Sequence, residues 1–257
     1  LKAAIQEAEG KNESDYTASS WKTFAKALEE AKAAAADNTV TQEAADLART
    51  NLLKAANALV KKGEKPEYDN IAPEAKADGI CDYTNDLGGL ATLNDGYEPT
   101  ESHDTSHGAW HNWNNRYENG VAKNAWVSYT WDKPVEINSM DIYYFSDHGG
   151  IVAPKSASFK YLNDAGEWVV ADEAQGLACV EDEYNTVKLA NIKTKAIRMT
   201  MEPEFMNDGD PAHGVGVIEW KVYGKYAEDK PETVDKTALD AVIREAESRA
   251  EKDYTSD

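Results

Sequence analysis

Cysteine is scarce in this sequence, with only Cys81 and Cys179 among 257 residues. Two thiols cannot build a disulfide framework, and alone they supply too few ligands for a thiolate zinc site. Whether the two pair with each other stays open. The fold must therefore depend on a packed core, for which a chain of this length with 41% hydrophobic residues has enough material.

Long apolar runs and positive charge are also in short supply. No run approaches the roughly 20 apolar residues of a membrane helix, and no basic segment leads into an apolar one at the start. If the protein is secreted, we expect its signal and anchor outside this sequence. The balance of 47 acidic against 27 basic residues gives a net charge of -20, which repels nucleic acid and anionic membranes. A neutral partner is therefore expected.

The common catalytic signatures are missing as well. The sequence has no Gly-x-Ser-x-Gly, His-Glu-x-x-His or glycine-rich phosphate-binding motif. Acidic residues are so abundant that nothing selects one pair as the two carboxylates of a glycosidase. His103, Asp104 and His107 offer metal-binding atoms, but loop histidines in a polar stretch are usually solvated. We expect no catalysis within this region.

Residues 1–62 are rich in alanine, lack proline and follow a helical pattern. Apolar residues recur at steps of three or four in two series, the second of which spans 40–59 and can be capped by Thr41. The first series consists of Trp21, Phe24, Leu28 and Ala31. Together with a shorter helix over 1–9, this pattern predicts a three-helix bundle that ends at the linker 61–70.

Residues 67–226 hold most of the glycine, proline, tyrosine and tryptophan and follow the alternating pattern of β-strands. The expected strands cover 126–131, 140–145, 158–162, 168–171, 197–201 and 217–224. Turn signals separate them, among them Asp132-Lys133-Pro134 and the stretch 163–166. Many short strands with no helix between them predict an antiparallel β-sandwich, either a jelly roll or immunoglobulin-like.

The two ends of the chain are similar to each other. Residues 1–19 and 239–257 agree at ten of 19 positions without a gap. The second copy, 235–257, has no partner helices to complete a core, so we expect Leu239 and Ile243 to lack an internal core. This organisation predicts a multidomain α and β chain in which the sandwich lies between helical spacers.

The repeated pattern also resembles a known family. Its Leu-x-x-x-Ile-x-x-Ala stretch, followed by Tyr-Thr and a Ser-Trp helix, is similar to the helical repeats called FIVAR. The resemblance covers 1–62 and the opening of a repeat at 235–257. FIVAR repeats recur in large glycosidases and surface proteins of bacteria, so the resemblance implies an extracellular protein, secreted or attached to the cell wall.

The central segment resembles a second family through the order of its motifs. LNDG (93–96) precedes a tryptophan-rich loop, then WVSYTWDKPVEINSMDIYYF (126–145), and GVIEWKVYG (216–224) closes the segment. This order resembles the galactose-binding-like β-sandwich, which includes discoidin or coagulation-factor type C domains and family 32 carbohydrate-binding modules. The resemblance implies a jelly roll that binds glycan without catalysis, although the insert 98–124 departs from the family pattern.

This resemblance also implies a structural Ca²⁺ site. Calcium prefers six to eight oxygen ligands from carboxylates and carbonyls. The resemblance assigns Asp95 and Glu219 as side-chain ligands, with carbonyls from the 93–100 loop completing the shell. In the alternative interpretation, Asp95 only makes an Asx turn and Glu219 lies on a solvated edge.

The 107–116 stretch carries the predicted sugar site. Aromatic rings pack against the C–H faces of sugars, and planar polar side chains bond the hydroxyls around them. The predicted ligand-binding residues are Trp110, Trp113, Arg116, His111, Asn112, Asp147, His148 and Asn207. One of the first two tryptophans is expected to be buried, and Trp126, Trp131 and Trp220 are expected in the core.

We therefore expect a non-catalytic, glycan-binding and spacer region of a larger bacterial glycoside hydrolase. An adhesin segment or a structural spacer without sugar binding is the alternative. The sequence does not select the sugar, because arabinose, galactose and N-acetylhexosamines all offer an apolar face and reachable hydroxyls.

Overall fold

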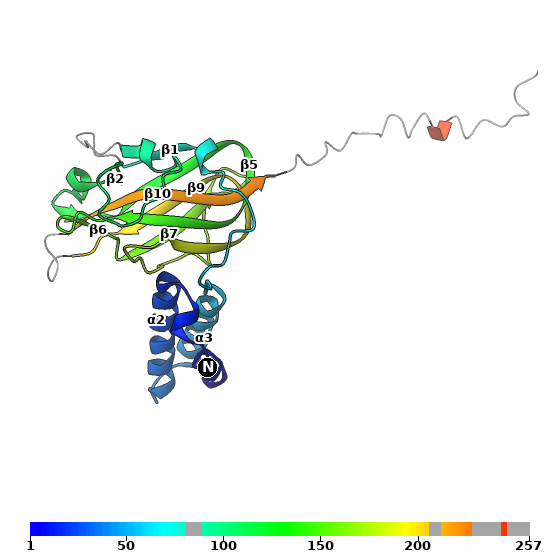
Figure 1. The fold of residues 1–257 in the computed structure, drawn as a ribbon. Coiled ribbons are helices and arrows are strands. Elements are labelled where there is room, and N and C mark those ends of the chain that lie inside the picture. The colour runs from blue at the N-terminus through cyan, green and yellow to red at the C-terminus, as the bar shows by residue number, and fades with distance from the viewer. Residues whose placement is uncertain (81–88, 206–211, 228–242, 246–257) are drawn as a thin grey trace, which may run out of the picture. The chain divides into compact units, whose positions relative to one another are not determined.

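The computed structural model describes residues 1–80, 89–205, 212–227 and 243–245 (Figure 1). Residues 1–227 form one compact unit and residues 228–257 a second. In the first unit, the helices come first along the chain and the strands follow. No described helix is both long and apolar enough to cross a membrane.

Three α-helices cover the first part of the chain and pack on one another: α1 (Lys2–Ala8), α2 (Ala18–Ala36) and α3 (Gln42–Asn57). Phe24, Ala31 and Leu52 are buried between them. The side chain of Thr41 accepts a hydrogen bond from the Ala44 N–H at 3.2 Å, which confirms it as the cap of α3. The expected apolar series over 40–59 is wrong at Leu47, whose surface is 60% exposed.

One continuous, mostly antiparallel sheet forms the sandwich, and its strands follow the order β2-β10-β5-β9-β7-β8, with β1 paired to β5 and β6 to β10. Their bounds are β1 (Lys76–Gly79), β2 (Trp110–His111), β5 (Ala125–Phe145), β6 (Ile151–Val152), β7 (Ser156–Leu162), β8 (Trp168–Val170), β9 (Asn185–Glu202) and β10 (Gly214–Tyr226). A separate hairpin joins β3 (Tyr117–Glu118) to β4 (Val121–Ala122). Short 3-10 turns cover 13–15, 72–74, 89–92 and 113–115.

The long strands differ from the expected pattern of many short ones. The predicted turn at Asp132-Lys133-Pro134 is wrong, because these residues lie within β5. The pairing of β5 with β9 shifts register between Thr130 and Val135, and a proline is tolerated at such an irregularity because no ladder hydrogen bond is needed there. The turn expected over 163–166 is present between β7 and β8.

The core of the sandwich is aromatic at its centre. Tyr129 stacks on Trp220 with ring centroids 4.3 Å apart, and the indole N–H of Trp131 donates to the Ile71 carbonyl at 2.9 Å. The expectation that Trp131 and Trp220 are core residues is confirmed, since both are buried. Trp126 differs, because it lies on the outer side of β5 and is partly exposed.

Helix α2 and the sheet side of the same unit are joined by hydrogen bonds. The Ser19 N–H, at the start of α2, donates to Oε1 of Glu183 at 3.0 Å, and the Ala178 N–H donates to Oγ1 of Thr23 at 3.0 Å. Lys188 on β9 pairs with Glu64 at 2.7 Å.

Two sequence expectations fall wholly or partly outside the described residues. Of the second repeat, Ile243 is helical and 44% exposed, whereas Leu239 lies outside the described part. Cys179 is buried and burial raises the pKa of its thiol to about 12, but Cys81 is not among the described residues.

Candidate functional site

Three loops at one end of the sheet are tied together by hydrogen bonds. The Ser102 N–H donates to Oδ1 of Asp182 at 2.7 Å, and the Asp182 N–H donates to the Ser102 hydroxyl at 2.8 Å. The Ser146 N–H donates to the Ser102 carbonyl at 2.9 Å. The segments around residues 102, 146 and 182 therefore form a braced scaffold at the end of β5.

The first side-chain cluster on this scaffold is a stack around Arg116. Its guanidinium carbon lies 3.6 Å from the ring centre of Trp113 and 5.0 Å from that of Tyr117. Nε of Arg116 donates to the Ala212 carbonyl at 3.2 Å and an η-nitrogen donates to the Trp113 carbonyl at 2.6 Å. These bonds fix the guanidinium over the indole, where the cation–π attraction stabilises it.

The indole of Trp113 is packed on both sides. A Cβ atom at Gly150 would lie 2.4 Å from Cζ3 of the indole, so only glycine fits against the ring there. Arg116 covers the ring as well, and Trp113 is only partly exposed. Arg116 and Gly150 therefore limit how much of the indole can contact a sugar, and Trp113 remains a predicted ligand residue.

The second cluster consists of two histidines, His103 and His148, which come from two neighbouring loops. The rings of His103 and His148 stack with centroids 4.5 Å apart, and His148 is exposed. Nδ1 of His103 lies 3.0 Å from the Ser146 carbonyl, which orients that ring. Oδ1 of Asp147 accepts N–H bonds from Gly149 and Ile151, both at 2.8 Å, and closes the turn that leads to Gly150. Asp147 is exposed as well, so the predicted pair Asp147 and His148 comes together at the surface.

Three predicted contact residues are instead part of the scaffold. Trp110 has no exposed surface, and its indole N–H donates to the Ile80 carbonyl at 2.9 Å. His111 is 7% exposed, and Asn112 is 1% exposed with its side-chain oxygen accepting the Val215 N–H at 2.8 Å. The prediction that these three contact ligand is corrected, because their side chains are buried. Trp110 is the buried member of the tryptophan pair.

The remaining predicted ligand residue, Asn207, lies outside the described residues. Phe205, the last described residue before position 207, is 39% exposed. Neither His103 nor Tyr117 was among the predicted sugar-binding residues. The only signal for either was its position in the insert 98–124, where the loops rather than a strand pattern determine which residues meet.

The predicted cation site has one feature that calls for a cation. Glu219 is completely buried on β10, and within the described residues its carboxylate oxygens make no hydrogen bond of normal geometry, although the Gly96 N–H lies near them. Burial, followed by the negative charge of Asp95, raises the pKa of Glu219 to about 8, while Lys221 and the Gly96 amide oppose the rise. The alternative interpretation of Glu219 as a solvated edge residue is therefore wrong.

Asp95 fits the same site less simply. Its Oδ1 accepts the Tyr97 N–H at 3.1 Å, which is the Asx turn of the alternative interpretation, and its Oδ2 lies 3.1 Å from Nε2 of His107. The ring of His107 in turn stacks on Tyr97 at 4.0 Å. The charges of both Glu219 and Asp95 also act on buried Tyr129, whose pKa is raised chiefly by burial. The two carboxylates thus flank one buried region.

Backbone carbonyls would have to supply most of a calcium shell here. Within the described part of the chain, no group of three or more His, Cys, Asp or Glu side chains is placed to hold a metal. The Leu93 carbonyl already accepts bonds from the Tyr129 hydroxyl and the Trp220 N–H, both at 2.7 Å. The turn that follows, 94–98, carries the remaining carbonyls. Carboxylate and carbonyl oxygens are the ligands that a hard cation prefers.

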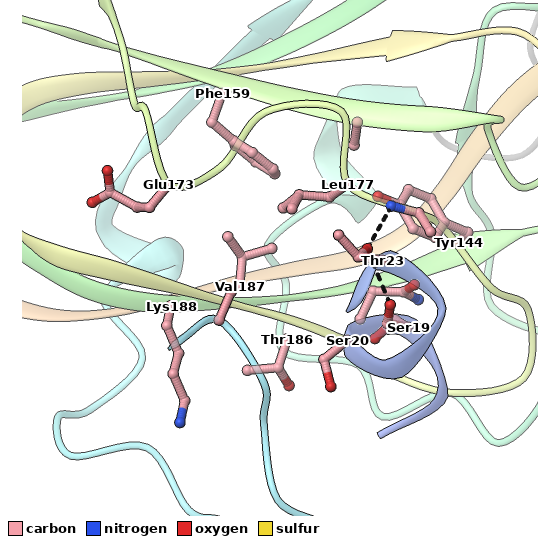
Figure 2. A pocket seen from close by; sticks show the side chains of 14 residues that line it. Ser19, Ser20, Thr23, Tyr144, Phe159, Glu173, Leu177, Thr186, Val187 and Lys188 are labelled. Carbon is pink, nitrogen blue, oxygen red and sulfur yellow. Dashed lines mark hydrogen bonds between the residues drawn. The ribbon is translucent and has the colours of Figure 1, made fainter. Parts of the chain in front are cut away.

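A cavity lies elsewhere, between α2 and the strands of the same unit (Figure 2). Ser19, Ser20 and Thr23 face Tyr144, Val187 and neighbouring side chains across it. Its volume of about 30 Å³ holds one or two water molecules and no sugar ring. The cavity therefore belongs to the junction between helix and sheet.

No protein-family model matches this chain. Over 61 residues, or 24% of the chain, it is 46% identical to the polysaccharide lyase 8 family protein HylA of Enterococcus faecalis, and the match spans only 4% of that protein's length.

Several solved structures are similar at low identity. The family 32 carbohydrate-binding module of NanJ from C. perfringens, in complex with galactose, is 16% identical with a TM-score of 0.46, covering 61% of this chain and 98% of that one. The family 32 module of EndoD from Streptococcus pneumoniae is 20% identical with a TM-score of 0.42, covering 61% and 100%. The Streptococcus pneumoniae β-galactosidase BgaA is 18% identical with a TM-score of 0.45, covering 64% and 100%.

Proposed function

We propose that this chain is a non-catalytic, carbohydrate-binding and spacer region of a larger bacterial enzyme that acts on glycans, secreted or held at the cell surface. The observation that carries the proposal is the braced end of the sandwich. There, the exposed residues Asp147 and His148 lie on the loop that also contacts Trp113 through Gly150, and the partly exposed His103 stacks on His148 from a second loop.

The chemistry of this surface suits a neutral sugar. Imidazole, carboxylate and guanidinium groups supply hydrogen-bond donors and acceptors for ring hydroxyls, and the indole edge of Trp113 supplies apolar contact. The loops are held by backbone and side-chain hydrogen bonds, so little conformational entropy is lost on binding. A shallow, partly aromatic surface of this kind favours weak binding of a single sugar or a chain end.

Weak binding is sufficient for targeting. When a module is tethered to an enzyme, the second encounter with a polymeric substrate becomes intramolecular, and the effective concentration rises. The 61-residue match to a polysaccharide lyase supports a polysaccharide-degrading parent chain. The resemblance of residues 1–62 to FIVAR repeats favours a spacer role for the helices.

We also propose a structural Ca²⁺ ion bound by Glu219, Asp95 and carbonyls of the 94–98 turn. The buried carboxyl group of Glu219 supports it, because a bound cation would stabilise the ionised form that burial disfavours. Asp95 would exchange its contact with His107 for the cation. When bound, the ion would neutralise the two carboxylates and fix the turn beside the loops.

The test of sugar binding is a glycan array followed by affinity gels with the best glycan. We expect His148→Asn and Arg116→Gln each to weaken binding by about tenfold, a loss near 1.4 kcal/mol. Asparagine tolerates the left-handed backbone found at position 148, so the loop is preserved. Tyr226→Ala is the matched control, because Tyr226 is 40% exposed at the opposite end of β10.

A protein that binds no glycan on the array while remaining folded would refute the proposal. That result would favour the alternative, an adhesin segment or a spacer. Hydrolysis of aryl glycosides by the chain would contradict its non-catalytic assignment.

A further inference from the structure

A second surface of interest lies on the open face of the sheet, away from the loops. Trp126 on β5 and Arg198 on β9 are partly exposed, whereas the residues that alternate with them, Val127, Ile197 and Met199, are fully buried. Because side chains alternate between the two faces of a strand, Trp126 and Arg198 point outward. Trp168 on β8 is partly exposed too.

These three side chains form one stack across the sheet. The guanidinium carbon of Arg198 lies 4.2 Å from the ring centre of Trp126 and 4.3 Å from that of Trp168. Contact with two indoles holds the guanidinium in place. We call this set the Trp–Arg–Trp platform. None of its members belongs to the loop clusters or to the cation site.

The side chain of Arg198 makes no hydrogen bond with the described residues. Its Nε is buried, so only the terminal guanidinium nitrogens remain for a ligand. Neither Arg198 nor its cross-strand neighbour Lys160 takes part in any of the ion pairs found in the described part of the chain. In a chain of net charge -20, two neighbouring cations without a carboxylate partner are unexpected.

Hydroxyl side chains lie beside the platform. Thr200 lies opposite Trp126 and Ser158, and both Thr200 and Ser158 are partly exposed. Partly exposed indoles, hydroxyls and a guanidinium spread over neighbouring strands match an extended polymer of rings better than a compact ligand. A carboxylate satisfies a guanidinium by two parallel bonds.

We propose that the Trp–Arg–Trp platform is a second binding surface, specific for an extended saccharide that carries carboxylate groups, with Arg198 and Lys160 as the carboxylate partners. This site goes beyond the sugar binding proposed for the loops and does not depend on it. The overall negative charge does not prevent this, because screening at physiological salt limits the repulsion from distant acidic residues to a range of about 8 Å. The local pair of cations then determines binding.

Polygalacturonate is the probe, and its fully methyl-esterified form is the neutral control with the same sugar backbone. Affinity gel electrophoresis of the intact chain should show retardation by polygalacturonate and weaker retardation by the ester. We expect Arg198→Gln and Lys160→Gln each to weaken binding by about tenfold or more. Arg49→Gln is the matched control, because it removes the same charge from an exposed position on α3.

Lys160→Gln separates a loss of binding from a loss of folding, because Lys160 is exposed and its replacement leaves the stack of Arg198 on the two indoles intact. Equal retardation by acid and ester, or unchanged binding in both variants, overturns the proposal. Equal binding of poly-L-glutamate also overturns it, because charge alone would then account for binding. His148→Asn is expected to leave polygalacturonate binding unchanged, so failure of the platform and failure of the loop site are distinguishable.

Discussion

Replacing Glu219 by glutamine is expected to stabilise the protein when calcium is removed and to abolish its response to calcium. The carboxylate is buried without a partner among the described residues, and its pKa is raised to about 8. In the unfolded chain the pKa returns to the ordinary 4.5. The folded state therefore holds a proton that the unfolded state releases.

The size of the effect follows from this difference. Each unit of pKa shift corresponds to about 1.4 kcal/mol, so at about pH 7 the wild-type protein loses up to about 3 kcal/mol relative to acid conditions. The contribution of Glu219 protonation to the free energy of unfolding is fully present below about pH 4.5 and is lost as the pH rises toward 8. Glutamine does not titrate, so its advantage should vanish near pH 4.5. The cost of burying a polar side chain without a hydrogen bond applies to glutamate and to glutamine alike, so it does not contribute to the difference between the two proteins.

Urea unfolding with a chelator and with excess calcium, across this pH range, checks the prediction. With the cation at roughly 100 times its Kd, the wild-type protein should gain about 2.7 kcal/mol, and Glu219→Gln should gain almost nothing. Glu118→Gln is the matched control, because Glu118 is exposed on β3. Equal stability of wild type and Glu219→Gln in chelator at neutral pH would refute the account of an unpartnered buried carboxylate.

Three smaller changes test other parts of the structure. Gly150→Ala should lower the stability by about 1 to 3 kcal/mol and displace Trp113, since its Cβ would lie 2.4 Å from the indole; unchanged tryptophan fluorescence would contradict this. Glu183→Ala should cost up to about 1 kcal/mol and speed amide exchange at Ser19, because the start of α2 loses its carboxylate; unchanged exchange would argue against the contact. Tyr129→Phe should cost about 1 to 3 kcal/mol in urea unfolding, because two buried carbonyls lose a donor, and a neutral result would show that they find other partners.

The sequence predicted well those features that depend on local periodicity. The spacing of Phe24 and Ala31 identified the buried side of α2, and alternation identified the inward-facing Trp131 and Trp220. Such patterns depend only on which face of an element is covered. The cap at Thr41 was also predictable from the sequence, because it acts within a single turn of the helix.

The site was harder to predict because non-local contacts build it. Aromatic and polar residue types were clustered in 107–116, but whether each faces solvent depends on strand pairing. Pairing of β2 with β10 buries Trp110, and Asn112 is used by Val215, more than 100 residues further along the chain. The stacking of His103 on His148 likewise joins two loops that no periodic pattern connects.

The turn expected at Asp132-Lys133-Pro134 failed for a different reason. Proline and aspartate favour turns, but here the flanking residues pair with β9 on both sides of a register shift. Tertiary pairing therefore overrode the local turn signal.

Backbone hydrogen exchange with and without the best glycan from the array locates the glycan site. Exchange should slow on binding at residues 113–117 and 146–151, the two loop segments that meet at Gly150, with no change at the Tyr226 end of β10. Protection confined to the open sheet face, or to the helices, would contradict the assignment of the glycan site to these loops.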